Sequence, residues 1–217
     1  MAMAEGRRLQ GDDGAVLVEF ALVAPLLIML VFGLIDYGRM YNQKNVLIRS
    51  VQSAARTGAS QGPDRYADYN VIQSVEASLS AMDGAQIERV IVFRASAANG
   101  QVPAACLSTA RPDDLTAVGV NSGTTRCNIY SRSQVGYRGN VLGFFPGTTN
   151  CVGGWDASWC PTTRSRGSDT TDPDFLGVYV EVEAKALTGI VALPTATMTS
   201  TSVFRLDPCI TGVSCGV

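Results

Sequence analysis

The longest apolar run of the chain lies near its N-terminus, at residues 15–35, and Glu19 is its only charged residue. A helix rises ~1.5 Å per residue, so this run would be roughly 31 Å long, which matches the hydrocarbon thickness of a bilayer. The run therefore predicts a helix that is able to span a membrane. Pro25 lies within it and has no N–H donor, so we expect a local kink there.

Beyond residue 35, apolar and small residues recur at helical spacing, so we expect the same helix to continue to about residue 58. These residues are Tyr37, Met40, Tyr41, Leu47, Ile48, Val51, Ala54, Ala55 and Gly58. Pro63 then interrupts the pattern. A second amphipathic helix is predicted after it, ending near Gly84, and its apolar positions are Ile72, Val75, Leu79 and Met82.

Several later segments have the pattern of β-strands. Residues 178–186 alternate apolar and polar side chains, which predicts a strand with one buried face and one face in water. Residues 87–94 are rich in β-branched side chains, and the Thr/Ser-rich stretch ending at 203–205 is a candidate antiparallel partner. Residues 127–131 are a further candidate. The pattern predicts an α+β fold, in which a small, mainly antiparallel sheet packs on helices and the long N-terminal helix forms a stem.

These elements divide the chain into consecutive parts. With 217 residues there is room for about one domain plus an appended element. We expect a leader at residues 1–14, a membrane helix at 15–35 and an extension of that helix at 36–58. An α+β domain at 59–217 would follow, with a long loop region at 107–175.

The predicted loop region is rich in Gly, Ser, Thr and Asp, and loops of this length are either functional or held by cross-links. Its aromatic residues are Tyr130, Tyr137, Phe144, Phe145, Trp155 and Trp159. We interpret them as a satellite core beside disulfides, and the alternative is a surface that binds another protein or an external target. Asp169, Asp172 and Asp174 carry oxygens that suit Ca²⁺, but they lack the spacing of a calcium loop, which favours a solvated acidic loop.

All six cysteines lie at residue 106 or beyond, at Cys106, Cys127, Cys151, Cys160, Cys209 and Cys215. None forms a C-x-x-C pair, so a zinc site is poorly supported. An even number of cysteines among loops favours disulfides, which an oxidising compartment permits. Six cysteines allow 15 connectivities, and pairing between neighbours in the sequence closes the shortest loops.

Composition and charge exclude several classes of function. Charged residues make up 17% of the chain and the formal net charge is -2, so nucleic acid is not an expected partner. The chain contains no His, which removes the usual nucleophile pairs and the commonest transition-metal ligand. The acids Glu181 and Glu183 fall on the predicted wet face of a strand. We therefore expect no enzyme, no catalytic residue, no metal and no cofactor.

Three interpretations compete for the apolar segment. A secretory signal peptide would have a shorter apolar core and a small-x-small cleavage site, whereas this run leads into Asp36-Tyr37-Gly38-Arg39. A plain signal anchor leaves Glu19 as a costly charge, at ~2.5 to 3.5 kcal/mol near the middle of the bilayer. That penalty is smaller here because Glu19 lies near one end of the run.

The third interpretation rests on the order Gly14, four apolar residues, Glu19 and Phe20 behind a short polar leader. This arrangement resembles the processing site of type IV prepilins, in which a membrane peptidase cuts after the glycine on the cytoplasmic side. The resemblance implies that Ala15 becomes the new N-terminus and that Glu19 becomes the fifth residue. A glycine lets the backbone enter a protease cleft, and the freed amine of Ala15 is a cationic partner for Glu19.

The wider sequence V-E-F-A-L-V-A-P-L-L-I-M-L-V-F-G-L-I-D-Y-G-R, at residues 18–39, resembles the TadE-like pseudopilins of tight-adherence (Tad, Flp) pilus systems. Residues 51–59, V-Q-S-A-A-R-T-G-A, continue the resemblance. It implies a minor pseudopilin that acts in pilus assembly, initiation or localisation for adherence. The implied partners are a prepilin peptidase, other pilins and pseudopilins, the inner-membrane assembly platform and the lipid bilayer. The alternative is an unprocessed, signal-anchored binding module outside the membrane.

The orientation in the membrane does not follow from charge alone. Arg7 and Arg8 precede the apolar run, but Arg39, Lys44 and Arg49 follow it, so the positive-inside rule is not decisive. The processing resemblance and the distribution of the cysteines both favour a single-pass protein of the cytoplasmic membrane. Its N-terminus would lie in the cytoplasm, and its C-terminal domain would lie outside the membrane or on the pilus.

Overall fold

The computed structural model describes residues 12–80, 82, 85–109, 118–132, 151, 153–167, 172–184 and 196–207. The helices are α1 (Asp12–Gln61), α2 (Ala67–Leu79) and the short α3 (Ala104–Ser108). Two 3₁₀ turns, η1 (Ala157–Trp159) and η2 (Pro161–Thr163), lie between strands. The strands are β1 (Ala85–Ala95), β2 (Val118–Ser122), β3 (Thr125–Ser131), β4 (Phe175–Ala184) and β5 (Ala196–Arg205).

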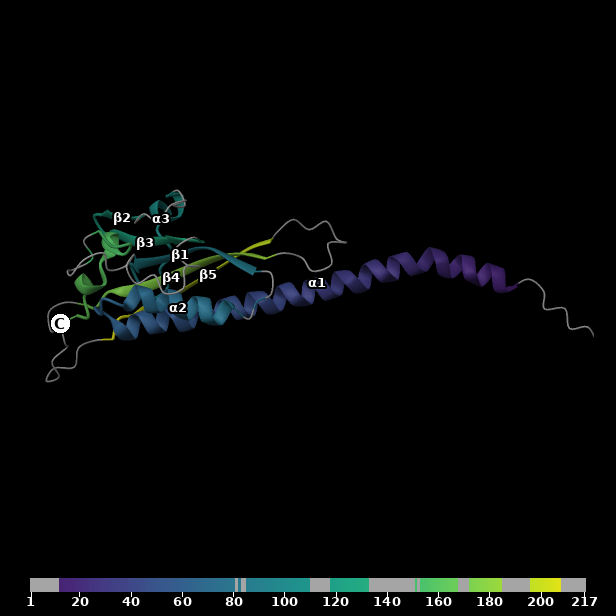
Figure 1. Ribbon diagram of the computed structural model, residues 1–217, viewed down its shortest axis with the longest axis horizontal. Helices are drawn as coiled ribbons and strands as arrows, with labels where there is room; N and C mark the ends of the chain where they lie inside the picture. The colour runs from purple at the N-terminus through teal and green to yellow at the C-terminus, as the bar shows by residue number, and fades with distance from the viewer. Residues whose placement is uncertain are drawn as a thin grey trace, which may run out of the picture.

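Helix α1 is the stem of the molecule, and it confirms the prediction of one long N-terminal helix. Figure 1 shows that its N-terminal part projects away from the rest of the structure, whereas its C-terminal part lies beside α2 and the sheet. Pro25 lies inside α1, and the helix remains continuous through it. The projecting part changes direction in Figure 1, as a proline within a helix favours.

All five strands join one antiparallel sheet in the order β2-β3-β1-β4-β5. The predicted strand at 178–186 corresponds to β4, which begins earlier, and its expected antiparallel partner is β5. Strand β4 lies between β1 and β5, and each residue from Phe175 to Ala184 has a partner in both neighbouring strands. The α+β prediction is therefore confirmed: one long helix carries a small antiparallel sheet with helices packed on it.

The main hydrophobic core lies between one face of the sheet and the helices α1 and α2. Helix α1 contributes Leu47, Val51 and Ala54 to it, and all three are fully buried. Gly58 lies where α1 and α2 approach closely, because a Cβ at this position would lie 2.7 Å from Cγ2 of Val71. The second helix was predicted to end near Gly84, but α2 ends at Leu79 and begins before the predicted apolar positions.

The opposite face of the sheet is buried along β1 and β3 but exposed along much of β5, so the prediction of a strand with one face in water is wrong only in part. Ile91, Phe93 and Ile129 form a second core on this face and are fully buried. Glu181 is only 6% exposed, because its carboxylate accepts a hydrogen bond from Nε of Arg89 at 2.7 Å. The burial of Glu181 was not visible in the alternating pattern of β4, because it depends on a charged partner in the neighbouring strand β1.

The predicted loop region at 107–175 contains regular structure. Strands β2 and β3 form a hairpin, and η1 and η2 follow within residues 157–163. The disulfide Cys106–Cys127 joins α3 to β3, and Cys151–Cys160 closes the segment before η2. Both are pairs between neighbours in the sequence, as the shortest loops favour, whereas Cys209 and Cys215 lie outside the described residues.

Some aromatic residues of the predicted loop region are buried in the core, and the others lie outside the described residues. Trp155 and Trp159 are buried in the main core together with Tyr130, next to the Cys151–Cys160 disulfide. They thus extend the main core rather than forming a separate satellite. Tyr137, Phe144 and Phe145 lie outside the described residues.

Replacing Gly177 by Ala is expected to destabilise the domain by about 1 to 3 kcal/mol, because the added methyl group overpacks a closed core. Gly177 is paired with Phe93 across β4 and β1, and a Cβ there would lie 2.2 Å from Cζ of the Phe93 ring. The ring is fully buried, so the added methyl group meets a packed side chain rather than solvent. Urea unfolding of the full chain in detergent, followed by tryptophan fluorescence, measures the change.

Gly38→Ala is the control for this substitution, because no atom lies within 4 Å of a Cβ at that position. Gly38→Ala should leave the unfolding midpoint of the domain unchanged. Adding Phe93→Leu to Gly177→Ala should recover part of the loss, since the smaller side chain makes room for the methyl group. An unchanged midpoint for Gly177→Ala alone would show that the sheet adjusts without cost.

Candidate membrane anchor and processing site

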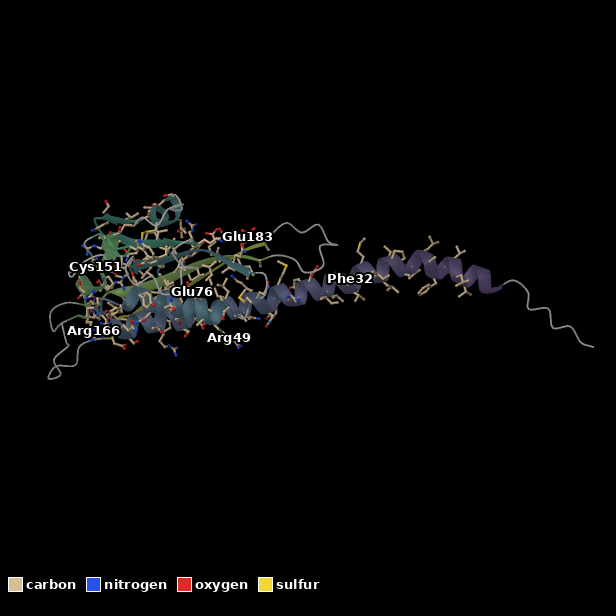
Figure 2. The ribbon with its side chains drawn as sticks, in the orientation of Figure 1. Phe32, Arg49, Glu76, Cys151, Arg166 and Glu183 are labelled. Carbon is tan, nitrogen blue, oxygen red and sulfur yellow. A yellow bond between two sulfur atoms is a disulfide. The ribbon has the colours of Figure 1, made fainter. Side chains whose placement is uncertain are left out.

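The N-terminal part of α1 exposes its apolar side chains on all sides. Along residues 14–61, α1 is long and apolar enough to cross a membrane, and the most apolar window of it is 0% buried. Phe20 is 66% exposed and Leu34 is 62% exposed, and the large apolar residues between them are also exposed, except Phe32, which is half-buried. Figure 2 shows side chains projecting from every side of this part of α1, including the labelled Phe32. A core helix of a soluble domain would hide one face, so this surface is suited to lipid or to other helices.

Gly14 and Ala15 lie in the first turn of α1, two residues after it begins at Asp12. A Cβ at Gly14 would meet no atom within 4 Å, and both residues are exposed. Packing within the chain therefore gives no reason for a glycine at this position. A glycine is also a poor helix former, so neither helix propensity nor packing against the described residues favours it here.

Glu19 follows one turn after Ala15 and is exposed on the same part of the helix. Among the described residues Glu19 has no ion-pair partner. Phe20 beside it is exposed as well. A carboxylate in an apolar helix needs a cationic or hydrogen-bonding partner when the helix enters a bilayer, and this partner has to come from elsewhere.

Residues 14–59 match the family model described as TadE-like protein. This N-terminal segment is TadE-like. The matched residues are roughly one fifth of the chain, and they lie within α1, including the part of α1 that packs in the main core of the domain. Searches of the curated proteins and of the solved structures find no match to this chain.

The TadE-like segment suggests a protein associated with a Tad pilus, and hence partners that belong to the pilus system. The single apolar helix near the N-terminus suggests a membrane anchor, which is consistent with a single-pass membrane protein. The same α1 then enters the domain, where its buried face begins at Asp36 and continues through Gln43 and Leu47. The anchor and the domain are therefore joined by one unbroken helix rather than by a flexible linker.

A buried polar cluster, formed by Asp68, Asn128, Tyr130, Asp156, Trp159 and Arg164, was not predicted from the sequence. Nη2 of Arg164 lies 2.7 Å from Oδ1 of Asp68, and both side chains are 0% exposed. Nδ2 of Asn128 and the hydroxyl of Tyr130 both donate to Oδ2 of Asp68 at 2.8 Å. The cluster joins α2, β3 and the segment around η1.

Asn128 and Arg164 also hold the tryptophan segment in place within this polar cluster. The N–H of Trp159 donates to Oδ1 of Asn128 at 2.7 Å, and the carbonyl of Trp159 accepts from Asn128 and Arg164. The Arg164 guanidinium stacks over the Trp159 ring, 4.2 Å from its centroid. Burial raises the pKa of Tyr130, as does the nearby Asp68 carboxylate, so its hydroxyl remains a donor. These contacts are structural, because they tie the η1 segment to the sheet.

The acidic positions that were considered for calcium have separate roles. Asp174 is buried, and its carboxylate accepts from Nε of Arg94 at 2.8 Å and from the N–H of Ser165 at 2.9 Å. The prediction of a solvated acidic loop is thus wrong for Asp174. Asp172 is 98% exposed at its side chain and lies 3.5 Å from Arg205, and Asp169 lies outside the described residues. The described residues include no group of three acids, cysteines or histidines that could hold a metal ion.

Proposed function

We propose that this protein is a minor pseudopilin of a Tad-type pilus, which a prepilin peptidase cleaves between Gly14 and Ala15. The observation that carries this proposal is the TadE-like match over residues 14–59, on a helix whose most apolar window has no buried residue. The open surroundings of Gly14 support it, because the glycine packs against none of the described residues.

Each part of α1 has a role in this proposal. Cleavage frees the α-amino group of Ala15, one turn away from Glu19, so an amine on the same or an adjacent subunit neutralises the intramembrane carboxylate. The exposed helix then packs against other pilins and pseudopilins and against the assembly platform. Because there is no flexible linker, movement of the helix in the membrane is transmitted directly to the domain.

The orientation of the protein in the membrane belongs to the same proposal. The disulfides Cys106–Cys127 and Cys151–Cys160 both lie in the globular domain. Such bonds persist in oxidising compartments and are rare in the cytoplasm. They support a domain outside the cytoplasmic membrane, with the leader in the cytoplasm, where prepilin peptidases act.

The N-terminal sequence of the protein purified from native membranes tests the proposal. We expect a start at Ala15, and we expect Gly14→Arg to leave only the uncleaved form, because the arginine side chain blocks the peptidase cleft. Gly11→Arg is the matched control, since it adds the same charge to the leader three residues earlier and should leave processing intact. Glu19→Ala should be processed but should fail to assemble, as measured by its co-purification with pilus components.

Other results would contradict the proposal in different ways. A start at Met1 in the unaltered protein favours the alternative, an unprocessed anchored module that binds a ligand through its domain. A start beyond Asp36 shows a secreted protein whose apolar segment is removed. Equal processing of Gly14→Arg and Gly11→Arg would show that the glycine is not recognised by the peptidase.

A further inference from the structure

The side chains on one face of α1 change from apolar to polar beyond the apolar run. Leu34 is 62% exposed, Tyr37 is 71% exposed and Tyr41 is 64% exposed. At 100° per residue these three side chains lie within about 60° of one another around the helix. Gln52 lies on the same face and is exposed, and Arg49 is exposed beside it. The face therefore passes from aliphatic to tyrosine to polar side chains as α1 leaves the anchor.

From these observations we propose that Tyr37 and Tyr41 lie in the lipid headgroup layer and set the depth of the protein in the bilayer. Tyrosine suits this layer because its ring is apolar and its hydroxyl group needs a polar partner. A fully exposed pair of tyrosines, one helical turn apart, has no such advantage in bulk water. The inference rests on the membrane anchor of the proposed function.

The dimensions of the helix agree with this placement. If the hydrocarbon layer ends near Ile35, Tyr37 lies ~3 Å and Tyr41 ~9 Å further along the helix axis, at 1.5 Å per residue. The headgroup region adds roughly 5 to 8 Å on each side of the hydrocarbon layer. Side chains of a helix lean towards its N-terminus, which brings both rings back towards the hydrocarbon.

The opposite face of α1 at the same level belongs to the domain. Asp36 is 2% exposed and Gln43 is 8% exposed, so this face is covered by the rest of the chain immediately after the apolar run ends. Nζ of Lys44 donates to the carbonyl of Thr199 on β5, which directs this cation towards the domain rather than towards lipid. Figure 2 places the labelled Glu183 at the end of the sheet nearest the anchor, and Arg49 on the side of α1 away from the sheet. The domain thus begins at the membrane surface, and only the tyrosine face is left for lipid.

Tryptophan replacements in the full-length protein test this placement in vesicles of phosphatidylcholine and phosphatidylglycerol. The vesicles carry bromine either near the headgroup end or near the methyl end of the acyl chains, and bromine quenches nearby tryptophans. Tyr37→Trp and Tyr41→Trp are the test variants. Leu27→Trp is the deep control and Gln52→Trp the aqueous control. The unaltered protein supplies the background from Trp155 and Trp159, which are buried in the domain.

We expect the added fluorescence of Tyr37→Trp and Tyr41→Trp to be quenched about twofold more by shallow bromine than by deep bromine, as for interfacial aromatic residues. Leu27→Trp should show the reverse order, and Gln52→Trp should show no quenching. If Leu27→Trp is quenched but the test variants are not, the anchor stands and the tyrosine placement is wrong. If Leu27→Trp is not quenched, the membrane anchor itself fails. Emission of the test variants that responds to the protein-to-lipid ratio, but not to bromine, would assign this face to contacts between subunits and overturn the proposal.

Discussion

Replacing Asp68 by Ala is expected to destabilise the globular domain by about 3 to 5 kcal/mol, because it leaves the Arg164 guanidinium buried without its counter-charge. Both side chains are 0% exposed in the native protein, and Nη2 of Arg164 lies 2.7 Å from Asp68. The substitution also removes the acceptor of Asn128 and of the Tyr130 hydroxyl. Domains of this size are usually stable by only about 5 to 15 kcal/mol, so the loss is a large fraction of the total.

Urea unfolding of the full-length protein in detergent measures this effect, with tryptophan fluorescence as the signal. Trp155 and Trp159 are both buried in the main core, so the signal follows the domain rather than the anchor. Asp172→Ala is the matched control, because the Asp172 side chain is 98% exposed and its loss should change stability by less than about 0.5 kcal/mol. Asp68→Asn keeps the shape of the side chain but not its charge, so it should be destabilising as well.

A double replacement separates the cost of the unpaired charge from the value of the pair. Asp68→Leu combined with Arg164→Met removes both charges and should recover part of the stability lost in Asp68→Ala. The attraction within a buried ion pair is largely offset by the cost of removing both charges from water, so replacing the whole pair costs less than removing one partner. If Asp68→Asn unfolds at the same urea concentration as the unaltered protein, the Asp68 charge contributes nothing to the fold. The structural role assigned to the polar cluster would then be wrong.

Asp156 is expected to make the stability of the domain fall as the pH rises from about 4 to about 7. Burial and the neighbouring Asp68 carboxylate raise the pKa of Asp156 from 3.8 to about 7, against the opposing effects of its own backbone N–H, Arg164 and Arg65. The residue is 0% exposed, and neither carboxylate oxygen has a hydrogen-bond partner among the described residues. The folded domain therefore favours the protonated, uncharged form of Asp156.

The sign of this pH dependence follows from the pKa of Asp156 in the unfolded chain, 3.8, and in the folded domain, about 7. Below pH 3.8 the carboxyl group is protonated in both the folded and the unfolded chain, so its burial costs little. Between pH 3.8 and about 7 the unfolded chain releases the proton and the folded domain keeps it, so each pH unit lowers the free energy of unfolding by about 1.4 kcal/mol. Above pH 7 both forms are charged and the effect levels off, at a total of about 4 kcal/mol.

Asp156→Asn isolates this contribution, because the amide cannot ionise and resembles the protonated acid in shape. At pH 8 we expect Asp156→Asn to be more stable than the unaltered protein by about 2 to 4 kcal/mol, and the difference should disappear near pH 4. Urea unfolding at a series of pH values measures the difference between the two proteins. Asp172→Asn should show no such pH-dependent difference. A difference between Asp156→Asn and the unaltered protein that is the same at every pH would show that Asp156 titrates normally in the folded domain.

The elements of the fold were largely predictable, because their signals are local in the sequence. A single long apolar segment in a bilayer folds as a helix, because a helix satisfies its backbone N–H and C=O groups with hydrogen bonds inside the segment. The alternation of β4 and the β-branched content of β1 are likewise properties of short stretches, so both strands were placed to within a few residues. The proposed processing and assembly residues Gly14, Ala15 and Glu19 could be named from the sequence for the same reason, since all three lie within one short stretch.

The errors in the prediction have a common cause, which is pairing between distant residues. Glu181 was expected in water, yet Arg89 reaches it from the neighbouring strand and allows its burial. Asp174 was treated as part of a solvated loop, yet Arg94 binds it across the sheet. The sequence does not show which distant residue will form an ion pair with a given charged residue. Its burial therefore becomes clear only once the strands are paired in the fold.

By itself, the sequence determined that α1 is an uninterrupted helix with an apolar surface, that the domain is α+β, and that the N-terminal segment is TadE-like. These features depend on hydrophobic spacing and on one short motif, and the spacing and the motif can each be recognised without knowledge of the fold. Only the tertiary structure decided that the second face of the sheet is buried along β1 and β3, and that Asp68 and Arg164, 96 residues apart, meet in a buried polar cluster. It also decided that Tyr37 and Tyr41 face away from the domain while Asp36 faces into it. The physical reason is that burial of a polar or aromatic side chain depends on what the folded chain brings next to it, and no local pattern contains that information.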